Sequence, residues 1–409
     1  MFNIKLNPLW SKTVLVITFS FLLILSSYVL IDPKGSAKNL LSIYSFFAIN
    51  FESLFLYIGF GVLVFLVVIA FSKSGSRKIV LEGRSDYSYF SWYSMLFATG
   101  MGAALLYWST YEWLVYYTNP IEGEDQSLLK ARSYPLFHWM FTGWALYILP
   151  TVAFVFSLMK NPNTPLTFSG ILLKEQSGPI RILLDIFFIG AILTGAGVGL
   201  ALSFPLMSAA ISKLFGFNQT IYLDFVMLLI CMCIVSISVY RGLQNGIKKL
   251  SNFNIILVIS FLTLILITGP TKYIVINTFE PVTYVLKNYL SLSLLKSQYS
   301  LDWTVFYWAW YIALAPAVGA FIVNISNNKT VRELIFGALI VGSLGCIFHI
   351  GVLSNISIYA YENGILDAPK IYADQSMTSH ALVIETISSL DYGIFSVSYT
   401  HLTLPTSFL

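Results

Sequence analysis

The sequence is poor in charged residues. Only 10% of its 409 residues are Asp, Glu, Lys or Arg, whereas 57% are hydrophobic. A soluble domain carries roughly 25% charged residues, so this chain has too little polar surface for a soluble protein. The basic residues never gather into one patch, which excludes a nucleic-acid-binding protein.

Cysteine and histidine are also scarce. Cys231, Cys233 and Cys346 are the three cysteines, and all lie inside apolar runs, which excludes a disulfide framework or a thiolate metal site. The four histidines form no HExxH motif, and no nucleophile–base pair occurs at a useful spacing. We therefore expect neither an enzyme nor a bound cofactor.

Long apolar runs dominate what is present. Runs of about 20 apolar residues are long enough to cross a bilayer as helices. The first run is too long for a signal peptide and is kept as a helix. The fold class is an all-α polytopic membrane protein. Nine spans are predicted, at residues 13–31, 46–71, 88–117, 136–159, 182–210, 221–240, 252–270, 303–323 and 334–358.

Charges alternate between successive loops. Most of the 23 basic residues fall in every second loop, such as 72–87, and the acidic residues gather in the others, such as Glu122 to Asp125. Basic loops stay in the cytoplasm. The pattern predicts a multi-pass protein of the cytoplasmic membrane with its N-terminus inside. In the long external segment 271–302, Glu280–Leu295 has mixed polarity, which fits a helix on the membrane surface or a partly ordered loop.

Aromatic side chains form two faces. Residues 303–311 hold six rings, and helical spacing places Trp303, Tyr307, Trp310 and Tyr311 within a narrow arc, with Trp308 to one side. Such a face is typical of a lipid-interface belt or of packing. It also suits a cage for a quaternary ammonium, which has no N–H and is recognised by ring faces.

The second aromatic face lies on the predicted span 136–159. Helical spacing places Trp139, Trp144 and Tyr147 within about 140° of one another on this helix. His138 and Glu112 are ionisable groups inside or at the edge of spans, and such groups are functional candidates. Each also fits a hydrogen-bonded structural role.

Glycine punctuates two spans. Gly195, Gly197 and Gly199 suit close helix packing. Gly100-Met101-Gly102 brings flexible backbone to mid-membrane, where a broken helix can present carbonyl groups to a cation such as Na⁺. A continuous, closely packed helix remains the alternative for this stretch.

Together these motifs resemble the betaine/choline/carnitine transporter family. The resemblance covers about residues 10–395 and rests on the following segments: Gly100-Met101-Gly102 with Glu112, Phe137-His138-Trp139 with Trp144 and Tyr147, Asp302 to Trp310, Gly242 to Gly246, and Ile325 to Glu333. It implies a LeuT-type core of inverted repeats, preceded by two extra helices, and a homotrimer.

The resemblance also implies a site. Trp139, Trp144 and Tyr147 would form an ammonium cage closed by Trp310, with Tyr311 and Met101 completing the substrate-binding set. Ala98 and Met101 would offer backbone oxygens to Na⁺, with the hydroxyl of Thr194 nearby. The implied function is Na⁺-coupled uptake of betaine, choline, carnitine or a related compatible solute.

Several positions depart from the family pattern. Tyr311 and Leu314 stand where family members often have further aromatic rings, and Ala103 stands near where another glycine is common. Ion-independent exchangers of the family have an arginine at the position that matches Asn254. An exchanger remains an alternative function, and a sensor or channel without coupled transport is an alternative of another class.

The predicted organisation is a membrane domain over 1–396. It comprises two peripheral helices (1–86), a first repeat (87–270), an external segment (271–302) and the start of a second repeat (303–396). Residues 397–409 are predicted to be non-native. Val397 to Leu402 can be back-translated as GTC-TCT-TAT-ACA-CAT-CT, the end of a common sequencing adapter, so we expect the gene to continue with further helices.

Overall fold

The computed structural model describes residues 8–81, 83–101, 104–121, 125–173 and 178–389. The regular elements of these residues are helices. One isolated β-bridge pairs Lys78 with Thr330 in the loops. Eight helical stretches are long and apolar enough to cross a membrane. The all-α membrane fold is therefore confirmed, whereas the inverted-repeat arrangement stays a prediction. The predicted tail 397–409 lies outside the described residues.

The eight candidate spans match eight of the nine predicted ones. Their bounds are Lys12–Ile31, Pro33–Phe71, Leu128–Lys160, Pro179–Phe215, Ile221–Tyr240, Leu243–Thr268, Ser300–Ile325 and Val331–Glu362. The predicted span 88–117 instead corresponds to two shorter helices, α3 (Tyr89–Met101) and α4 (Ala104–Thr118). Residues 102–103 between them are not described, so the choice between a broken and a continuous helix at Gly100-Met101-Gly102 stays open.

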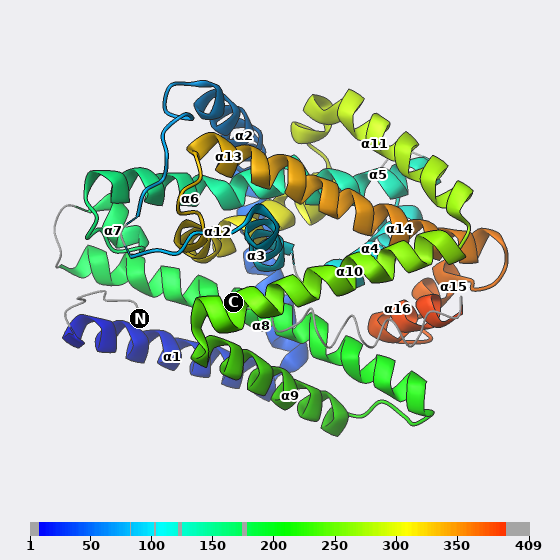
Figure 1. The fold of residues 1–409 in the computed structure, drawn as a ribbon. Coiled ribbons are helices and arrows are strands. Elements are labelled where there is room, and N and C mark those ends of the chain that lie inside the picture. The colour runs from blue at the N-terminus through cyan, green and yellow to red at the C-terminus, as the bar shows by residue number, and fades with distance from the viewer. Residues whose placement is uncertain (1–7, 82, 102–103, 122–124, 174–177, 390–409) are drawn as a thin grey trace. The chain divides into compact units, whose positions relative to one another are not determined.

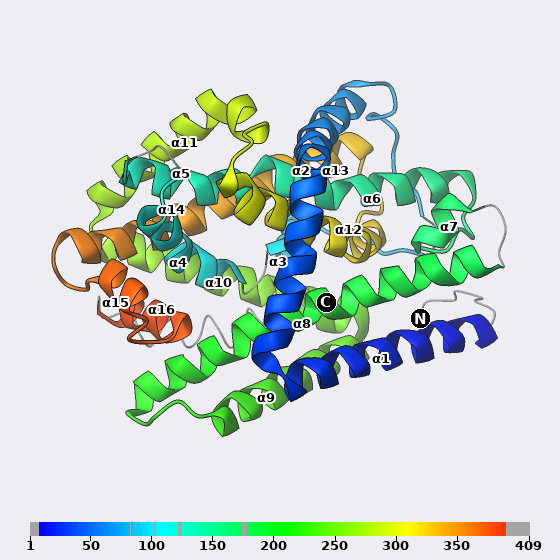
Figure 2. The same cartoon turned by 180° about the vertical axis from the view of Figure 1, so that it is seen from behind.

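The first compact unit comprises Met1–Asp86, Ala145–Ala196 and Ser293–Ile335. It holds α1 (Pro8–Ile31), α2 (Pro33–Phe71), most of α6 (Phe141–Lys160), α7 (Phe168–Leu172), the start of α8 (Pro179–Phe215), the π-turn η2 (Ser300–Thr304), α12 (Val305–Ile325) and most of α13 (Val331–Phe336). The long helix α2, dark blue in Figure 2, packs against η2 and α12. The Tyr44 hydroxyl donates to the Leu301 carbonyl oxygen at 2.5 Å.

Backbone bonds tie two distant loops of this unit together. The amide of Ile79 donates to the carbonyl of Lys329 at 2.7 Å, and the amide of Leu81 donates to the Asn327 side chain at 2.8 Å. Each bond satisfies a polar backbone group that would otherwise need water. The loop after α2 is thereby fixed to the loop after α12.

The second unit comprises Tyr87–Trp144, Gly197–Leu292 and the chain from Phe336 onward. It holds α3, α4, α5 (Leu128–Trp139), α9 (Ile221–Tyr240), η1 (Leu243–Ile247), α10 (Lys248–Thr268), α11 (Thr271–Ser293), η3 (Gly337–Gly342), α14 (Ser343–Glu362), α15 (Ala368–Asp374) and α16 (Ser379–Ser388). Helix α14, orange in Figure 1, packs along α4. Polar bonds accompany the apolar contacts, since Ser354 donates to the Ser109 carbonyl and the Trp113 indole donates to Ser357.

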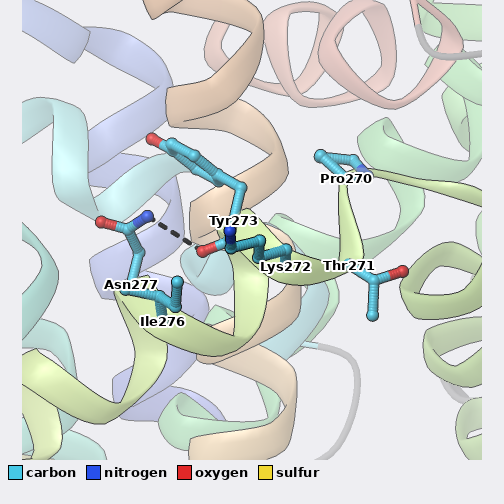
Figure 3. A pocket seen from close by; sticks show the side chains of 6 residues that line it. All are labelled: Pro270, Thr271, Lys272, Tyr273, Ile276 and Asn277. Carbon is cyan, nitrogen blue, oxygen red and sulfur yellow. Dashed lines mark hydrogen bonds between the residues drawn. The ribbon is translucent and has the colours of Figure 1, made fainter.

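The segment predicted as a surface helix or a partly ordered loop is helical. It forms α11, which begins at Thr271, nine residues before the predicted start at Glu280. One face is buried through Ile274, Val285 and Leu292. A hollow of about 500 Å³ lies at the start of the helix and is lined by Pro270, Thr271, Lys272, Tyr273, Ile276 and Asn277. Figure 3 shows these side chains, and the side-chain amide nitrogen of Asn277 donates to the Tyr273 carbonyl oxygen.

Candidate functional site

The aromatic face predicted on α12 is present in the structure. Tyr307 stacks on Trp310 and on Tyr311, with ring centroids 6.2 and 6.0 Å apart, and Trp303 lies 6.5 Å from Tyr307. Tyr307, Trp308 and Tyr311 are fully buried. A lipid-interface belt would leave these rings at the surface, so that interpretation is wrong for these three. Packing and a cage remain as interpretations.

One ring of α6 joins this group. Tyr147 meets Tyr311 edge to face, with centroids 5.2 Å apart and planes at 76°. This is the arrangement in which the positive ring edge meets the negative ring face. Tyr147, Trp310 and Tyr311 therefore lie together within the first unit, which joins two motifs that are far apart in the sequence.

The helix carrying the second face is not continuous. Helix α5 ends at Trp139, Met140 leaves the helical region with φ −89° and ψ −137°, and α6 starts at Phe141. The prediction of a single helical face for Trp139, Trp144 and Tyr147 is therefore wrong in its geometry. Trp139 belongs to α5, whereas the other two rings belong to α6.

Trp139 is held by a carboxylate. Its indole Nε1–H donates to Oε2 of Glu112 at 2.8 Å, and both side chains are buried. The other oxygen of Glu112 accepts a hydrogen bond from the Tyr116 hydroxyl at 2.6 Å. The Nδ1 atom of His138 lies 3.1 Å from the Tyr116 oxygen and 3.6 Å from Glu112. The sequence flagged Glu112 and His138 separately, and the structure unites them in one cluster.

Trp144 lies in an aromatic stack that the sequence did not reveal. Its ring stacks on Phe97 at 6.0 Å, and Phe97 stacks on His349 at 5.6 Å. Gly342 packs so closely that a Cβ atom there would lie 2.3 Å from the indole. The three partners come from α3, η3 and α14, and no local pattern pairs such distant residues. The one local sign of this packing in the sequence is the glycine at 342, which leaves room for a large ring.

The residues predicted for Na⁺ have separate surroundings. Ala98 is buried in α3, and Met101 is the last residue of that helix. The side chain of Met101 lies outside the described residues, as does Ala103. Thr194 is exposed on α8, and its hydroxyl donates to the Gly190 carbonyl at 2.8 Å. Ion binding by Ala98, Met101 and Thr194 stays a prediction.

The rings and the carboxylate suit one kind of ligand. A cation without N–H groups gains about 0.5–2 kcal/mol from each ring face it contacts. Buried rings and a buried anion are more effective than exposed ones because water does not screen them. Tyr147, Trp310 and Tyr311 belong to the first unit, whereas Trp139 and Trp144 belong to the second.

Comparisons with known proteins agree on one family. A sequence model described as "BCCT, betaine/carnitine/choline family transporter" matches residues 13–409. A carnitine transporter of Acinetobacter baumannii is 29% identical over 77% of this chain and 60% of its own length. A glycine betaine/proline/choline/ectoine transporter of Vibrio parahaemolyticus is 31% identical over 88% of this chain and 66% of its own. A high-affinity choline transport protein of Escherichia coli is 29% identical over 74% of this chain and 46% of its own. The chain thus spans about half to two thirds of the length of these relatives.

Proposed function

Because the chain belongs to the betaine/carnitine/choline family of transporters, we propose that it carries a quaternary-ammonium compound across the cytoplasmic membrane by Na⁺-coupled uptake. Membership of this family indicates a transporter rather than an enzyme. Betaine, choline and carnitine are the substrate candidates, since the relatives named above carry these names. All three share a trimethylammonium group.

The observation that carries the proposal is the buried ring group of α6 and α12. Tyr147 and Tyr311 meet edge to face, and Trp310 stacks nearly parallel to Tyr311 at a centroid distance of 6.4 Å. A trimethylammonium group offers no hydrogen-bond donor, so ring faces are what distinguishes it from a hydrated ion. We propose that Tyr147, Trp310 and Tyr311 contribute ring faces to the substrate. The family resemblance implies the same role for Trp139 and Trp144.

Coupling to Na⁺ rests on the sequence Gly100-Met101-Gly102, whose last residue lies outside the described residues. Na⁺ is a hard cation that prefers oxygen ligands, and unwound backbone at mid-membrane can offer carbonyl oxygens to it. Asn254 is neutral, so it supplies no fixed positive charge in place of an ion. Ion-independent exchange remains the second candidate within the family.

Uptake measurements on the protein in cells test both parts of the proposal. Labelled betaine, choline and carnitine are offered to a host that lacks its own carriers, with Na⁺ present or replaced by K⁺. Uptake of at least one compound that falls when Na⁺ is removed supports the proposal. Uptake that continues without Na⁺ and needs internal substrate identifies an exchanger, and passive flux that follows the concentration gradient identifies a channel.

The proposed orientation places the N-terminus and the loop after α2 in the cytoplasm. Lys73 and Asp125 are both exposed and lie in loops predicted to face opposite sides. A cysteine at 125 should react with a membrane-impermeant thiol reagent in intact cells, and a cysteine at 73 should react only after the cells are opened. The reverse pattern contradicts the orientation. The homotrimer implied by the family resemblance stays a prediction.

A further inference from the structure

We propose that Glu112 is the positioning residue for Trp139, and that its carboxylate sets the affinity of the cage through the indole N–H. The inference rests on the proposed function, because it assigns Trp139 to the substrate site. It goes further in giving the buried carboxylate a role in recognition. Glu112 acts through Trp139 and is not itself required to touch the substrate.

The hydrogen bond between the two residues is short and buried from solvent. Nε1 of Trp139 lies 2.8 Å from Oε2 of Glu112, and the exposed fractions are 2% and 0%. Hydrogen bonds to an ionised acceptor are about twice as strong as bonds between neutral groups. An indole has one donor, so this bond fixes how the ring plane is turned at the end of α5.

The carboxylate has a second hydrogen-bond donor besides Trp139. The single hydroxyl proton of Tyr116 is donated to Oε1 of Glu112 at 2.6 Å. Nδ1 of His138 lies 3.1 Å from the Tyr116 oxygen. Glu112 therefore accepts two hydrogen bonds, from Tyr116 and from Trp139. A buried carboxylate is tolerated when it is paired and hydrogen-bonded in this way.

The carboxylate affects the ring electronically as well as sterically. An anion that accepts the indole proton pushes electron density into the π-system of Trp139. A more negative ring face attracts a cation more strongly. Loss of the charge should therefore weaken ammonium binding even where the ring stays in place.

A double-mutant cycle in the transporter tests this assignment. Glu112→Gln removes the charge and keeps the size of the side chain, and Trp139→Phe keeps a ring and removes the N–H. Each single variant should raise the KM for the transported ammonium compound by about ten-fold with a smaller change in kcat. Glu112→Gln leaves a neutral acceptor and Trp139→Phe leaves no donor, so both act on the same contact, and the double variant should resemble Trp139→Phe alone. Tyr116→Phe is the matched control, since it removes the partner of the other carboxylate oxygen and should change KM less.

The outcomes separate the inference from the function on which it rests. If the two KM effects multiply in the double variant, Glu112 does not act through Trp139 and the inference is overturned. An unchanged KM in Trp139→Phe also overturns it, and this variant decides the matter if Glu112→Gln does not reach the membrane. If the unmodified protein transports no quaternary-ammonium compound, the proposed function itself fails.

Discussion

Tyr147 and Tyr311 meet edge to face at a centroid distance of 5.2 Å. The two residues are far apart in the sequence, on α6 and α12, and both rings are fully buried. Buried aromatic pairs of this geometry contribute about 0.5–1.5 kcal/mol beyond their buried area. The pair therefore fixes the two helices at the place where the cage is proposed.

The ring of Tyr311, rather than its hydroxyl, is predicted to serve the substrate. Tyr311→Phe keeps the ring and should leave the KM for an ammonium compound within about two-fold, whereas Tyr311→Ala should raise it about ten-fold. Initial rates of uptake at varied substrate concentration give both values. If Phe is as harmful as Ala, the hydroxyl and not the ring face is what the site uses.

Gly342 is predicted to be required for the placement of Trp144. A Cβ atom at 342 would lie 2.3 Å from the indole, so Gly342→Ala must displace the ring or the π-turn η3. We expect a higher KM at normal membrane expression. Gly61→Ala is the matched control, because nothing lies within 4 Å of a Cβ atom there. Equal KM values for the two variants would contradict the predicted role of Trp144.

Gly319 lets α12 approach α6 closely. A Cβ atom at 319 would lie 2.9 Å from the backbone nitrogen of Thr151 and 3.1 Å from Cβ of Pro150. Backbone cannot move aside as a flexible side chain can, so Gly319→Ala should destabilise the protein by about 1–3 kcal/mol. Thermal unfolding in detergent measures the loss. Gly190→Ala, with its nearest neighbour 4.0 Å away, should not lower the midpoint.

Arg132 fastens α11 to α5 and α14. Its Nε donates to Asn355 at 2.9 Å, its second nitrogen donates to the Tyr273 hydroxyl at 2.5 Å, and Glu362 lies 3.6 Å away. Burial and the hydrogen bond to Glu362 raise the pKa of Tyr273, so its hydroxyl stays protonated at physiological pH. Tyr273 in turn donates to Glu362.

Removing this side chain should loosen α11. Arg132→Ala leaves Asn355 and Glu362 without their cationic partner and should cost about 2–4 kcal/mol. Hydrogen exchange should then rise in residues 271–280 more than in α4. Lys287→Ala, an exposed change on the same helix, is the control. Unchanged exchange in α11 would show that its apolar face alone holds it.

The sequence predicted the parts of the structure that depend on local periodicity. Apolar runs located eight of the spans, and helical spacing placed Tyr307, Trp310 and Tyr311 on one face. Mixed polarity around Glu280 left a helix and a loop open, and the structure resolves this in favour of the helix.

The remaining features depend on contacts between distant segments. The helix break at Met140 has no glycine or proline at that position that would have indicated it. Trp139 was therefore assigned to the same helix as Trp144, whereas it ends the preceding one. The stack of Trp144, Phe97 and His349 joins three elements, and the bond from Trp139 to Glu112 joins two. Only packing in three dimensions selects these partners.

The central claim is that aromatic rings recognise a quaternary ammonium by its charge. The most direct measurement is competition against labelled choline uptake by unlabelled choline and by 3,3-dimethylbutanol, which replaces the charged nitrogen with carbon and keeps the shape. The account predicts strong competition by choline and at least about ten-fold weaker competition by the carbon isostere. Equal competition by the two compounds would show that the site recognises shape and apolar surface rather than charge, and would contradict the account.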